Sequence, residues 1–304
     1  MSGDAPLLAL TGGSGFVGRH FAVAARRKGW RIRHLARRRP PDADPVDEWA
    51  FLDLSAVESA GLGGCTALVH LAAHIPSDHR DPAEAERCWR INVLATLKLV
   101  DAALRAGVGR IMQASSANAY APATEPPDEH APLFPRSRGY YLGSKVGQEI
   151  YAAERCRGED VLLQTLRLAS VYGPGQQSGA LGAMAQAAAN GGPIRIHGTG
   201  AFGSDLVHVE DVAKAMLLLL ASDRAGPFNV GSGVCTTIAE LAQLLAERSG
   251  VSVVHEAGAR EDCGFPALNI HRLKALGYSP MPLEQGVATM LKASMQRISG
   301  DRAG

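Results

Sequence analysis

The sequence lacks the features that mark secreted, membrane-spanning and nucleic-acid-binding proteins. It has five cysteines in 304 residues, an odd count without a Cys-x-x-Cys pair, which favours free thiols in a reducing cytoplasm over a disulfide framework. The longest apolar run, 215–221, is too short to cross a membrane, and the N-terminus has no basic stretch typical of a signal peptide. With 31 basic and 30 acidic residues, the chain has no charge excess for nucleic acid. We therefore expect a cytoplasmic protein that binds neither membranes nor nucleic acids.

Short apolar runs alternate with longer stretches of helical period in the first half of the chain. This alternation predicts an α/β fold with a parallel sheet covered by helices on both faces, the doubly wound Rossmann arrangement. The predicted strands are 7–12, 31–36, 67–73, 110–116 and 161–173, and the predicted helices are 16–29, 89–107 and 139–156.

The regular alternation ends near residue 174. Beyond it we predict helices over 178–192, 237–250 and 283–298, and two short strands followed by a helix within 193–222. We therefore divide the chain into a Rossmann domain, 1–173, and a smaller α/β lobe, 174–304, interleaved with the last strands of the sheet. The lobe is expected over the carboxyl edge of the sheet, where a substrate would bind.

The stretch TGGSGFVG, residues 11–18, leaves a predicted strand and opens a predicted helix. Gly12, Gly15 and Gly18 recur every three residues, as a tight turn and a close backbone approach to a pyrophosphate require. The helix N-terminus would offer its free N–H groups and its positive dipole end to the phosphates. An ordinary glycine-rich turn is the alternative, but the strand–helix–strand context favours dinucleotide binding.

Tyr141 and Lys145 are four residues apart on a predicted helix, so their side chains lie on one face. Ser116 ends a predicted strand, and strand carboxyl ends meet at the cofactor crevice of a doubly wound sheet. A tyrosine pKa of about 10 is too high for a base near neutrality. We expect the Lys145 ammonium and an oxidised nicotinamide to lower it. Tyr141 would then exchange a proton with a substrate oxygen that Ser116 holds in place.

Further motifs follow in a fixed order along the whole chain. Taken together, they resemble the extended short-chain dehydrogenase/reductase family, in its nucleotide-sugar epimerase/dehydratase branch. The motifs are TGGSGFVG (11–18), DL (53–54), HLAA (70–73), INVLATLKLVDAA (91–103), SSANAY (115–120), YLGSK (141–145), LRLASVYGPGQ (166–176), HVEDVAKA (208–215), FNVGSG (228–233) and LGYSP with LEQGV (276–287).

The resemblance implies NAD(P) as cofactor and assigns roles at matched positions. Tyr141 would be the acid/base, Lys145 would bind the nicotinamide ribose, and Ser116 would be the third catalytic residue. Asn92 would brace the site through backbone bonds, although a helix cap explains it nearly as well. The other cofactor contacts implied are Gly12, Gly15, Phe16, Val17 and Gly18 at the pyrophosphate, Asp53 and Leu54 at the adenine, Leu71, Ala72 and Ala73 at the centre, and Leu168 and Val171.

The chain departs from the family pattern at the substrate. Dehydratases of this branch carry an Asp–Glu pair where this chain has Ala117 and Asn118, so water elimination is not expected. Ser170 and Ser204 replace an asparagine and an arginine that hold the substrate diphosphate, and serine cannot supply the arginine charge. The remaining candidates for substrate binding are His74, Ser116, Arg195 and Arg260.

These observations predict an NAD(P)-dependent epimerase or 4-ketoreductase acting on a sugar hydroxyl or keto group, with a nucleotide sugar as substrate. Two alternatives stay open. One is an NADPH-dependent ketoreductase of a non-nucleotide substrate, and the other is a non-catalytic dinucleotide-binding protein on the same fold.

Three arginines, Arg37 to Arg39, follow the second predicted strand. NAD-preferring enzymes have an acidic residue at the end of this strand, where this chain has Ala36. Ala36 would not repel a 2′-phosphate, and Arg37 and Arg38 could bind one. We therefore predict that NADP(H) is favoured over NAD(H).

Two further patterns have simple alternatives. His70 and His74 are four residues apart but lie at a strand end, so we expect no metal site there. The helices 89–107 and 139–156 form a homodimer interface in many family members. The stripe Val93, Leu97, Val100 and Leu104 fits such an interface, but equally fits a core face.

Overall fold

The structure, a computed structural model, describes residues 5–57, 61–176, 179–258 and 264–301. At its centre is a seven-stranded sheet in the order β10-β6-β5-β4-β1-β2-β3, with every neighbouring pair parallel. The order reverses between β1 and β4, which is where doubly wound sheets open a crevice for a ligand. The strands are β1 (Leu7–Thr11), β2 (Arg31–Ala36), β3 (Glu48–Phe51), β4 (Ala67–His70), β5 (Arg110–Ser116), β6 (Leu162–Leu168) and β10 (Gly226–Val230).

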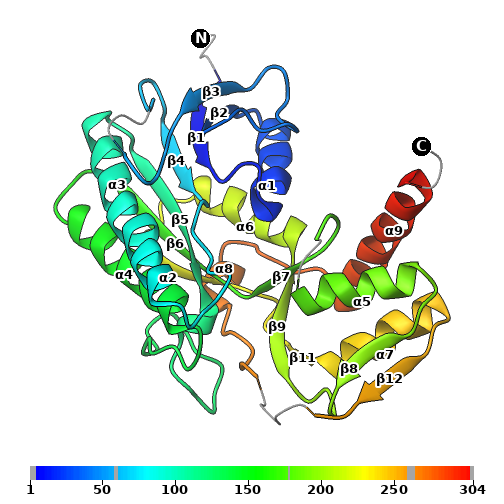
Figure 1. The fold of residues 1–304 in the computed structure, drawn as a ribbon. Coiled ribbons are helices and arrows are strands. Elements are labelled where there is room, and N and C mark those ends of the chain that lie inside the picture. Colours follow the sequence, from blue (N-terminus) through cyan, green and yellow to red (C-terminus); the bar gives the residue numbers. More distant parts are fainter. Residues whose placement is uncertain (1–4, 58–60, 177–178, 259–263, 302–304) are drawn as a thin grey trace.

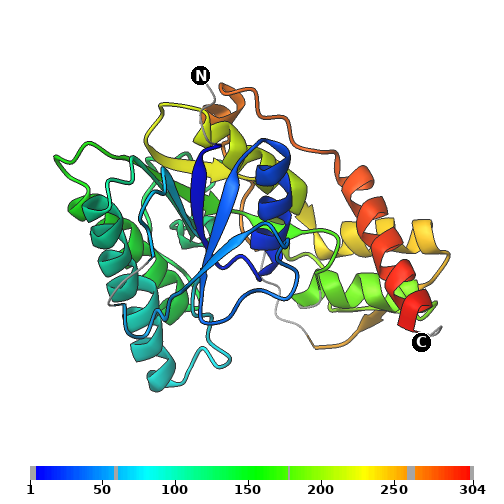
Figure 2. The same cartoon turned by 90° about the horizontal axis from the view of Figure 1, so that it is seen from above.

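Helices cover both faces of this sheet, as Figures 1 and 2 show. Successive side chains of β1 alternate between two cores: Leu8 and Leu10 pack on the side of α1 and α6, and Leu7 and Ala9 on the side of α3 and α4. The predicted α/β Rossmann fold is therefore confirmed. The helices are α1 (Phe16–Arg27) and α6 (Val209–Leu220) on one face, and α2 (Pro82–Cys88), η1 (Trp89–Leu94), α3 (Ala95–Arg105) and α4 (Gly139–Arg155) on the other, with a short α8 (His271–Lys274) beside β10.

The smaller lobe lies beside the sheet at the lower right of Figure 1. Its core joins Tyr172, Ile194, Leu241 and Val287. Between lobe segments the chain returns to the large sheet as α6 and β10. The lobe holds the strands β7 (Ser170–Tyr172), β9 (Gly203–His208) and β11 (Cys235–Thr237) in one sheet, β8 (Ile194–His197) and β12 (Val253–Glu256) in another, and the helices α5 (Gly179–Ala189), α7 (Ile238–Ser249) and α9 (Leu283–Asp301).

Two predicted elements differ from the structure. The strand expected over 161–173 breaks at Ala169, so that β6 joins the large sheet while β7 pairs with β9 in the lobe. The helix expected over 89–107 begins earlier, at Pro82, where Asp81 caps the backbone N–H of Ala83. It also contains a π-helical turn, η1, and such turns frequently lie at functional sites.

The apolar stripe on this helix belongs mainly to the core. Val93 and Val100 are fully buried, which agrees with the core explanation of the stripe. Other apolar side chains are exposed nearby, among them Trp89, which stacks edge-on against Tyr151. The homodimer stays a prediction. Among the described residues, no helix combines the length and apolar character needed to cross a membrane.

Candidate active site

The glycine loop joins β1 to α1 at the point where the sheet order reverses. Gly12 has a φ of 70°, and a Cβ there would lie 2.7 Å from the backbone nitrogen of Ala72. A Cβ on Gly18 would overlap the carbonyl group of Gly12. Gly15, the N-cap of α1, has no side-chain capping bond, so the first N–H groups of the helix can bind an anion. The loop is therefore shaped to receive a pyrophosphate.

A chain of hydrogen bonds connects the glycine loop to β4. Thr11 Oγ1 lies 2.7 Å from Nδ1 of His70, and Thr96 Oγ1 lies 2.9 Å from its Nε2. Because the Thr96 hydroxyl donates to the Asn92 carbonyl, the histidine must donate from Nε2 and accept at Nδ1 from Thr11. Burial lowers the pKa of His70 to about 3, so the imidazole stays neutral over the physiological pH range and these hydrogen bonds persist.

Asn92 continues the connection toward the candidate catalytic helix. It lies fully buried inside the π-helical turn η1, so the helix-cap interpretation is wrong. Its side chain accepts from the His74 N–H at 2.7 Å and donates to the His74 carbonyl and to Ser144 Oγ, both at 2.9 Å. Ser144 in turn donates to the Tyr141 carbonyl. Asn92 thus holds the segment after β4 against the first turn of α4.

The structure places the three predicted catalytic residues on neighbouring elements at the carboxyl edge of the sheet. Ser116 is the last residue of β5, and its Oγ accepts from the Asn118 N–H. Tyr141 and Lys145 lie on the first turns of α4, which packs against β5 and the turn after it. Lys145 is 2 % exposed and donates to Gln148 Oε1 at 2.5 Å.

Burial dominates the titration of these groups. Burial raises the pKa of Tyr141, and the positive charge of Arg138 acts in the opposite direction. The sequence predicts that the Lys145 ammonium and an oxidised nicotinamide lower this pKa. In the structure the net shift is upward, and the cation whose charge opposes it is Arg138. The reason is that Lys145 directs its ammonium to Gln148. Burial also lowers the pKa of Lys145 to about 8.

The comparisons with known proteins agree with this geometry. The sequence model of the NAD-dependent epimerase/dehydratase family matches residues 8–231. The chain belongs to this family. It is an enzyme of the extended short-chain dehydrogenase/reductase type, as the motifs indicated.

Relatives of this chain include an epimerase and a dehydratase. A UDP-glucose 4-epimerase of Mycolicibacterium smegmatis is 31 % identical over 221 residues, 68 % of this chain and 69 % of that protein. The structure of MoeE5 with UDP-glucose and NAD has a TM-score of 0.83 and 27 % identity, covering 96 % of this chain and 99 % of that one. DesIV, a dTDP-glucose 4,6-dehydratase of Streptomyces venezuelae solved with NAD, has a TM-score of 0.82 and 28 % identity, covering 97 % and 98 %.

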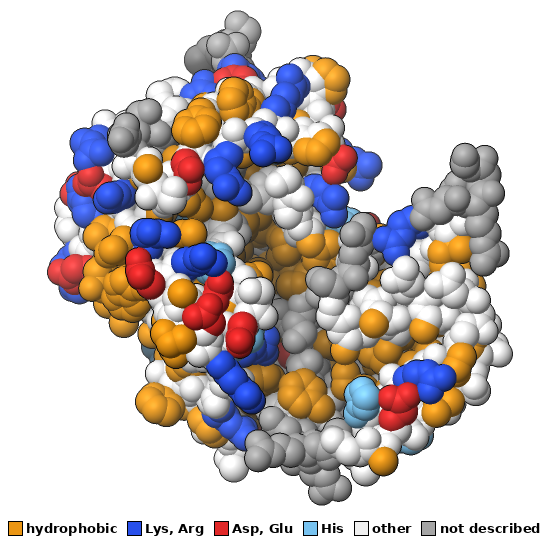
Figure 3. Space-filling view, viewed as in Figure 1, with side chains coloured by type: hydrophobic (Ala, Val, Ile, Leu, Met, Phe, Trp, Pro, Cys, Tyr) orange, Lys and Arg blue, Asp and Glu red, His pale blue; other side chains and the backbone are white. Residues whose placement is uncertain are grey.

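The residues predicted to contact the adenosine end of the cofactor lie after β2 and β3. Ala36 is the last residue of β2, and Arg37 and Arg38 follow it with exposed side chains. Asp53 lies close by. Hydrogen bonds from Ser55 lower the pKa of its carboxyl group, and the charge of Arg37 adds to this effect. Figure 3 shows Lys and Arg side chains gathered above the hollow between the sheet and the lobe.

The other predicted cofactor contacts follow β4, end β6 or lie in β7 of the lobe. Leu71, Ala72 and Ala73 directly follow β4, and the Ala72 N–H donates to Thr11 Oγ1 at 3.2 Å. Leu168 ends β6 and Val171 lies in β7. Within the described residues, no group of three His, Cys, Asp or Glu side chains could hold a metal ion.

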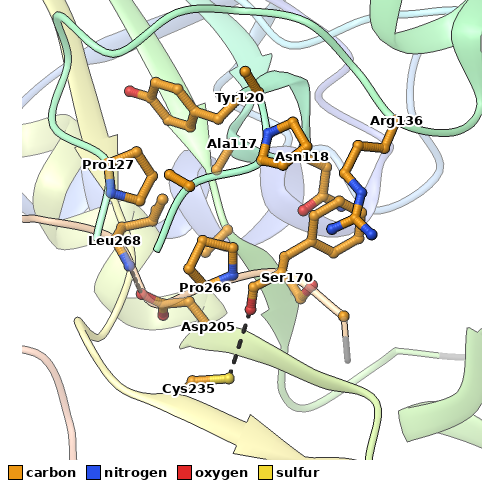
Figure 4. Close-up of a pocket in the computed structure, with 16 residues that line it drawn as sticks. Ala117, Asn118, Tyr120, Pro127, Arg136, Ser170, Asp205, Cys235, Pro266 and Leu268 are labelled. Atoms are coloured by element: carbon orange, nitrogen blue, oxygen red, sulfur yellow. Dashed lines mark hydrogen bonds between the residues drawn. The ribbon is translucent and has the colours of Figure 1, made fainter. Parts of the chain in front are cut away.

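A cavity of about 240 Å³ opens between the end of β5 and the lobe (Figure 4), and its lining includes neither Ser116 nor Tyr141. Ala117 and Asn118 line one side, directly after the candidate catalytic serine. The remaining lining is mainly apolar, and its polar side chains include Ser170 and Arg136.

Several predicted substrate residues lie elsewhere or are already paired. His74 Nε2 lies 2.6 Å from Glu84, and Arg195 donates to Glu256 at 2.9 Å beside a separate hollow of the lobe. Ser204 is almost completely buried on β9 and does not line the cavity described above. Arg260 lies outside the described residues. Sequence reasoning missed Arg136, because a cation in a proline-rich loop carries no positional signal.

Proposed function

We propose that this protein is an NAD(P)-dependent epimerase or 4-ketoreductase that acts on a hydroxyl or keto group of a nucleotide sugar. The observation that carries this proposal is the position of Ser116, Tyr141 and Lys145 at one edge of the sheet, next to an uncapped helix N-terminus behind a glycine loop. The same arrangement argues against a protein that only binds a dinucleotide, because binding alone does not require a tyrosine and a serine at that edge.

Each of the three residues has a defined task. The cofactor, when bound, supplies the site that accepts or donates hydride. Ser116 donates a hydrogen bond to the reacting oxygen and holds it in line with Tyr141. Tyr141 takes a proton from a hydroxyl or gives one to a carbonyl oxygen. Lys145 binds the ribose, and with the oxidised cofactor in place the positive charges there favour the phenolate of Tyr141.

Water elimination does not fit this site. A dehydratase needs one group to remove a proton and another to protonate the leaving hydroxyl. Ala117 and Asn118 occupy the wall of the cavity after Ser116, and neither side chain can exchange a proton near neutral pH.

The two serines at the diphosphate positions carry no charge. Ser170 lines the cavity without charge, and Ser204 is buried, so neither can act as a phosphate clamp. This observation favours a second candidate, an NADPH-dependent ketoreductase of a non-nucleotide substrate.

The structures of MoeE5 and DesIV contain NAD. We propose NADP(H) here, because Ala36 has no acidic group to bond a ribose 2′-hydroxyl and Arg37 stands next to it.

A ligand screen followed by turnover tests the proposed function. The melting temperature is measured with NAD, NADP and a panel of UDP- and dTDP-sugars, since a ligand that binds the folded state raises it. An epimerase interconverts a sugar without net consumption of cofactor, whereas a reductase consumes NADPH in step with product. If no dinucleotide raises the melting temperature, the proposed function is wrong. If dinucleotides bind and no nucleotide sugar does, the second candidate replaces the first.

A further inference from the structure

A row of buried polar side chains runs inward from Lys145 to the middle of the sheet. Lys145 donates to Gln148 Oε1 at 2.5 Å, and Gln148 Nε2 donates to Gln113 Oε1 at 3.0 Å and to the Ala114 carbonyl at 3.3 Å. Gln113 Nε2 donates in turn to Thr165 Oγ1 at 2.9 Å. None of these side chains is more than 5 % exposed. Burying an amide costs free energy unless it is hydrogen-bonded, so a row of buried amides beside Lys145 points to a role for these bonds.

The neighbours of Gln148 fix which end of its amide faces Lys145. Its nitrogen donates to two oxygen atoms, one on Gln113 and one on the backbone of β5. Turning the amide over would place an NH₂ group against the Lys145 ammonium and an oxygen against both acceptors. Gln148 therefore presents an oxygen to Lys145 and holds one of the three N–H donors of the ammonium.

The other groups that face Lys145 do not replace this acceptor. The negative charge of Glu149, the next residue on α4, raises the pKa of Lys145, but its carboxylate binds the guanidinium of Arg167 at 2.8 Å. Cys88 on α2 is a buried thiol whose pKa is raised by burial, and His70 on β4 is neutral because burial lowers its pKa. Tyr141 lies one turn earlier on the same helix.

We propose that Gln148 is a positioning residue that keeps Lys145 in its charged form and directs the remaining two N–H donors toward the cofactor ribose. The inference rests on the proposed function, since it assigns Lys145 to the ribose. The Ala114 carbonyl, which can only accept, fixes the amide of Gln148, and Gln113 accepts from the same nitrogen. The neutral acceptor matters because burial otherwise favours the uncharged amine, and the pKa of Lys145 is already lowered to about 8.

The sign of the pH effect follows from the charge. Only the ammonium form binds the ribose strongly, so the dissociation constant of the cofactor increases as pH rises through the pKa of Lys145. Gln148→Leu removes the acceptor, lowers that pKa and moves the increase to lower pH. Gln148→Glu supplies a carboxylate, raises that pKa and moves the increase to higher pH. Gln113 can adapt to the carboxylate by turning over its amide, because the Thr165 hydroxyl both donates and accepts. The Ala114 carbonyl loses its donor, so Gln148→Glu also lowers stability.

The test is a fluorescence titration of the full-length protein with NADH at a series of pH values. NADH is chosen because it has no 2′-phosphate that titrates in this range. At pH 8 we expect Gln148→Leu to weaken NADH binding about fivefold, because a pKa lowered by about one unit from about 8 reduces the charged fraction of Lys145 from about a half to about a tenth. We expect the two variants to shift the pH of the increase in opposite directions, by about one unit each.

Gln164→Leu is the matched control, because Gln164 on β6 is as deeply buried as Gln148 and its amide donates to the backbone at Leu219 and Arg224. It is expected to lower stability without moving the pH of the increase. If the dissociation constant of NADH increases at the same pH in the wild type and in both Gln148 variants, the inference is wrong. If Gln148→Leu does not fold, Gln148→Glu alone decides, and an unshifted profile overturns the inference. If the wild type binds neither NADH nor NADPH, it is the proposed function that fails.

Discussion

Tyr141→Phe is expected to reduce turnover by about 10²- to 10⁴-fold while leaving cofactor affinity nearly unchanged. The substitution removes a single oxygen, the one that we propose exchanges a proton with the substrate. The ring stays in place on the first turn of α4, and the Tyr141 carbonyl still accepts from Ser144. The measurement is kcat on whichever sugar or ketone the ligand screen identifies, together with the dissociation constant of the cofactor.

Tyr140→Phe is the natural control for this experiment. Tyr140 precedes Tyr141 on the same helix and is 36 % exposed, so the same loss of a hydroxyl occurs one position away. Its turnover should match that of the wild type. Unchanged turnover in Tyr141→Phe would refute the proposed mechanism, whereas an equal loss in both variants would indicate damage to the helix.

The second large effect is expected at the adenosine end of the site. Arg37→Ala should weaken NADPH binding by about 10- to 100-fold, because it removes a charge-assisted bond to the 2′-phosphate. NADH binding should change little, since NADH has no phosphate at that position. Both dissociation constants are measured by fluorescence titration at one fixed salt concentration, because salt screens exposed charges.

Arg39→Ala is the control for Arg37→Ala. Arg39 belongs to the same triplet but donates to the backbone carbonyls of Asp44 and Pro45, so its charge is used within the loop. NADPH affinity should fall much less in this variant. Tighter binding of NADH than NADPH by the wild type, unaffected by Arg37→Ala, would contradict the predicted cofactor preference.

The sequence was most informative where a local pattern is sufficient to determine structure. The glycine spacing of residues 12–18 predicts a tight loop with close backbone packing. The structure has this packing, because a Cβ on Gly18 would overlap the Gly12 carbonyl. The strand β5 and the helix α4 were predicted to within about a residue, because their apolar periodicity is strong. These two elements carry Ser116, Tyr141 and Lys145, so the positions of the candidate catalytic residues could be predicted from the sequence.

Features that depend on distant parts of the chain were not predictable in this way. The break at Ala169 arises because β7 finds its partner in β9, more than thirty residues further along. Nothing local signals that the chain separates there into two sheets. Likewise, β10 lies next to β6 although a lobe segment intervenes, and no motif indicates that pairing.

Gln148 shows the same limit within the site. It lies three residues after Lys145, so helical spacing places the two side chains on one face. The interaction was nevertheless missed, because a glutamine on a helix is usually exposed. Its burial becomes visible only when Gln113 and Ala114 of β5 are placed beneath it.

A crystal structure of the protein with NADP⁺ tests the central claim most directly. We predict that the pyrophosphate lies on the glycine loop, that Lys145 bonds the nicotinamide ribose, and that the nicotinamide faces Tyr141 and Ser116 beside the cavity. The 2′-phosphate should contact Arg37. A nicotinamide ring bound away from Tyr141, or density for the cofactor elsewhere on the protein, would contradict the account.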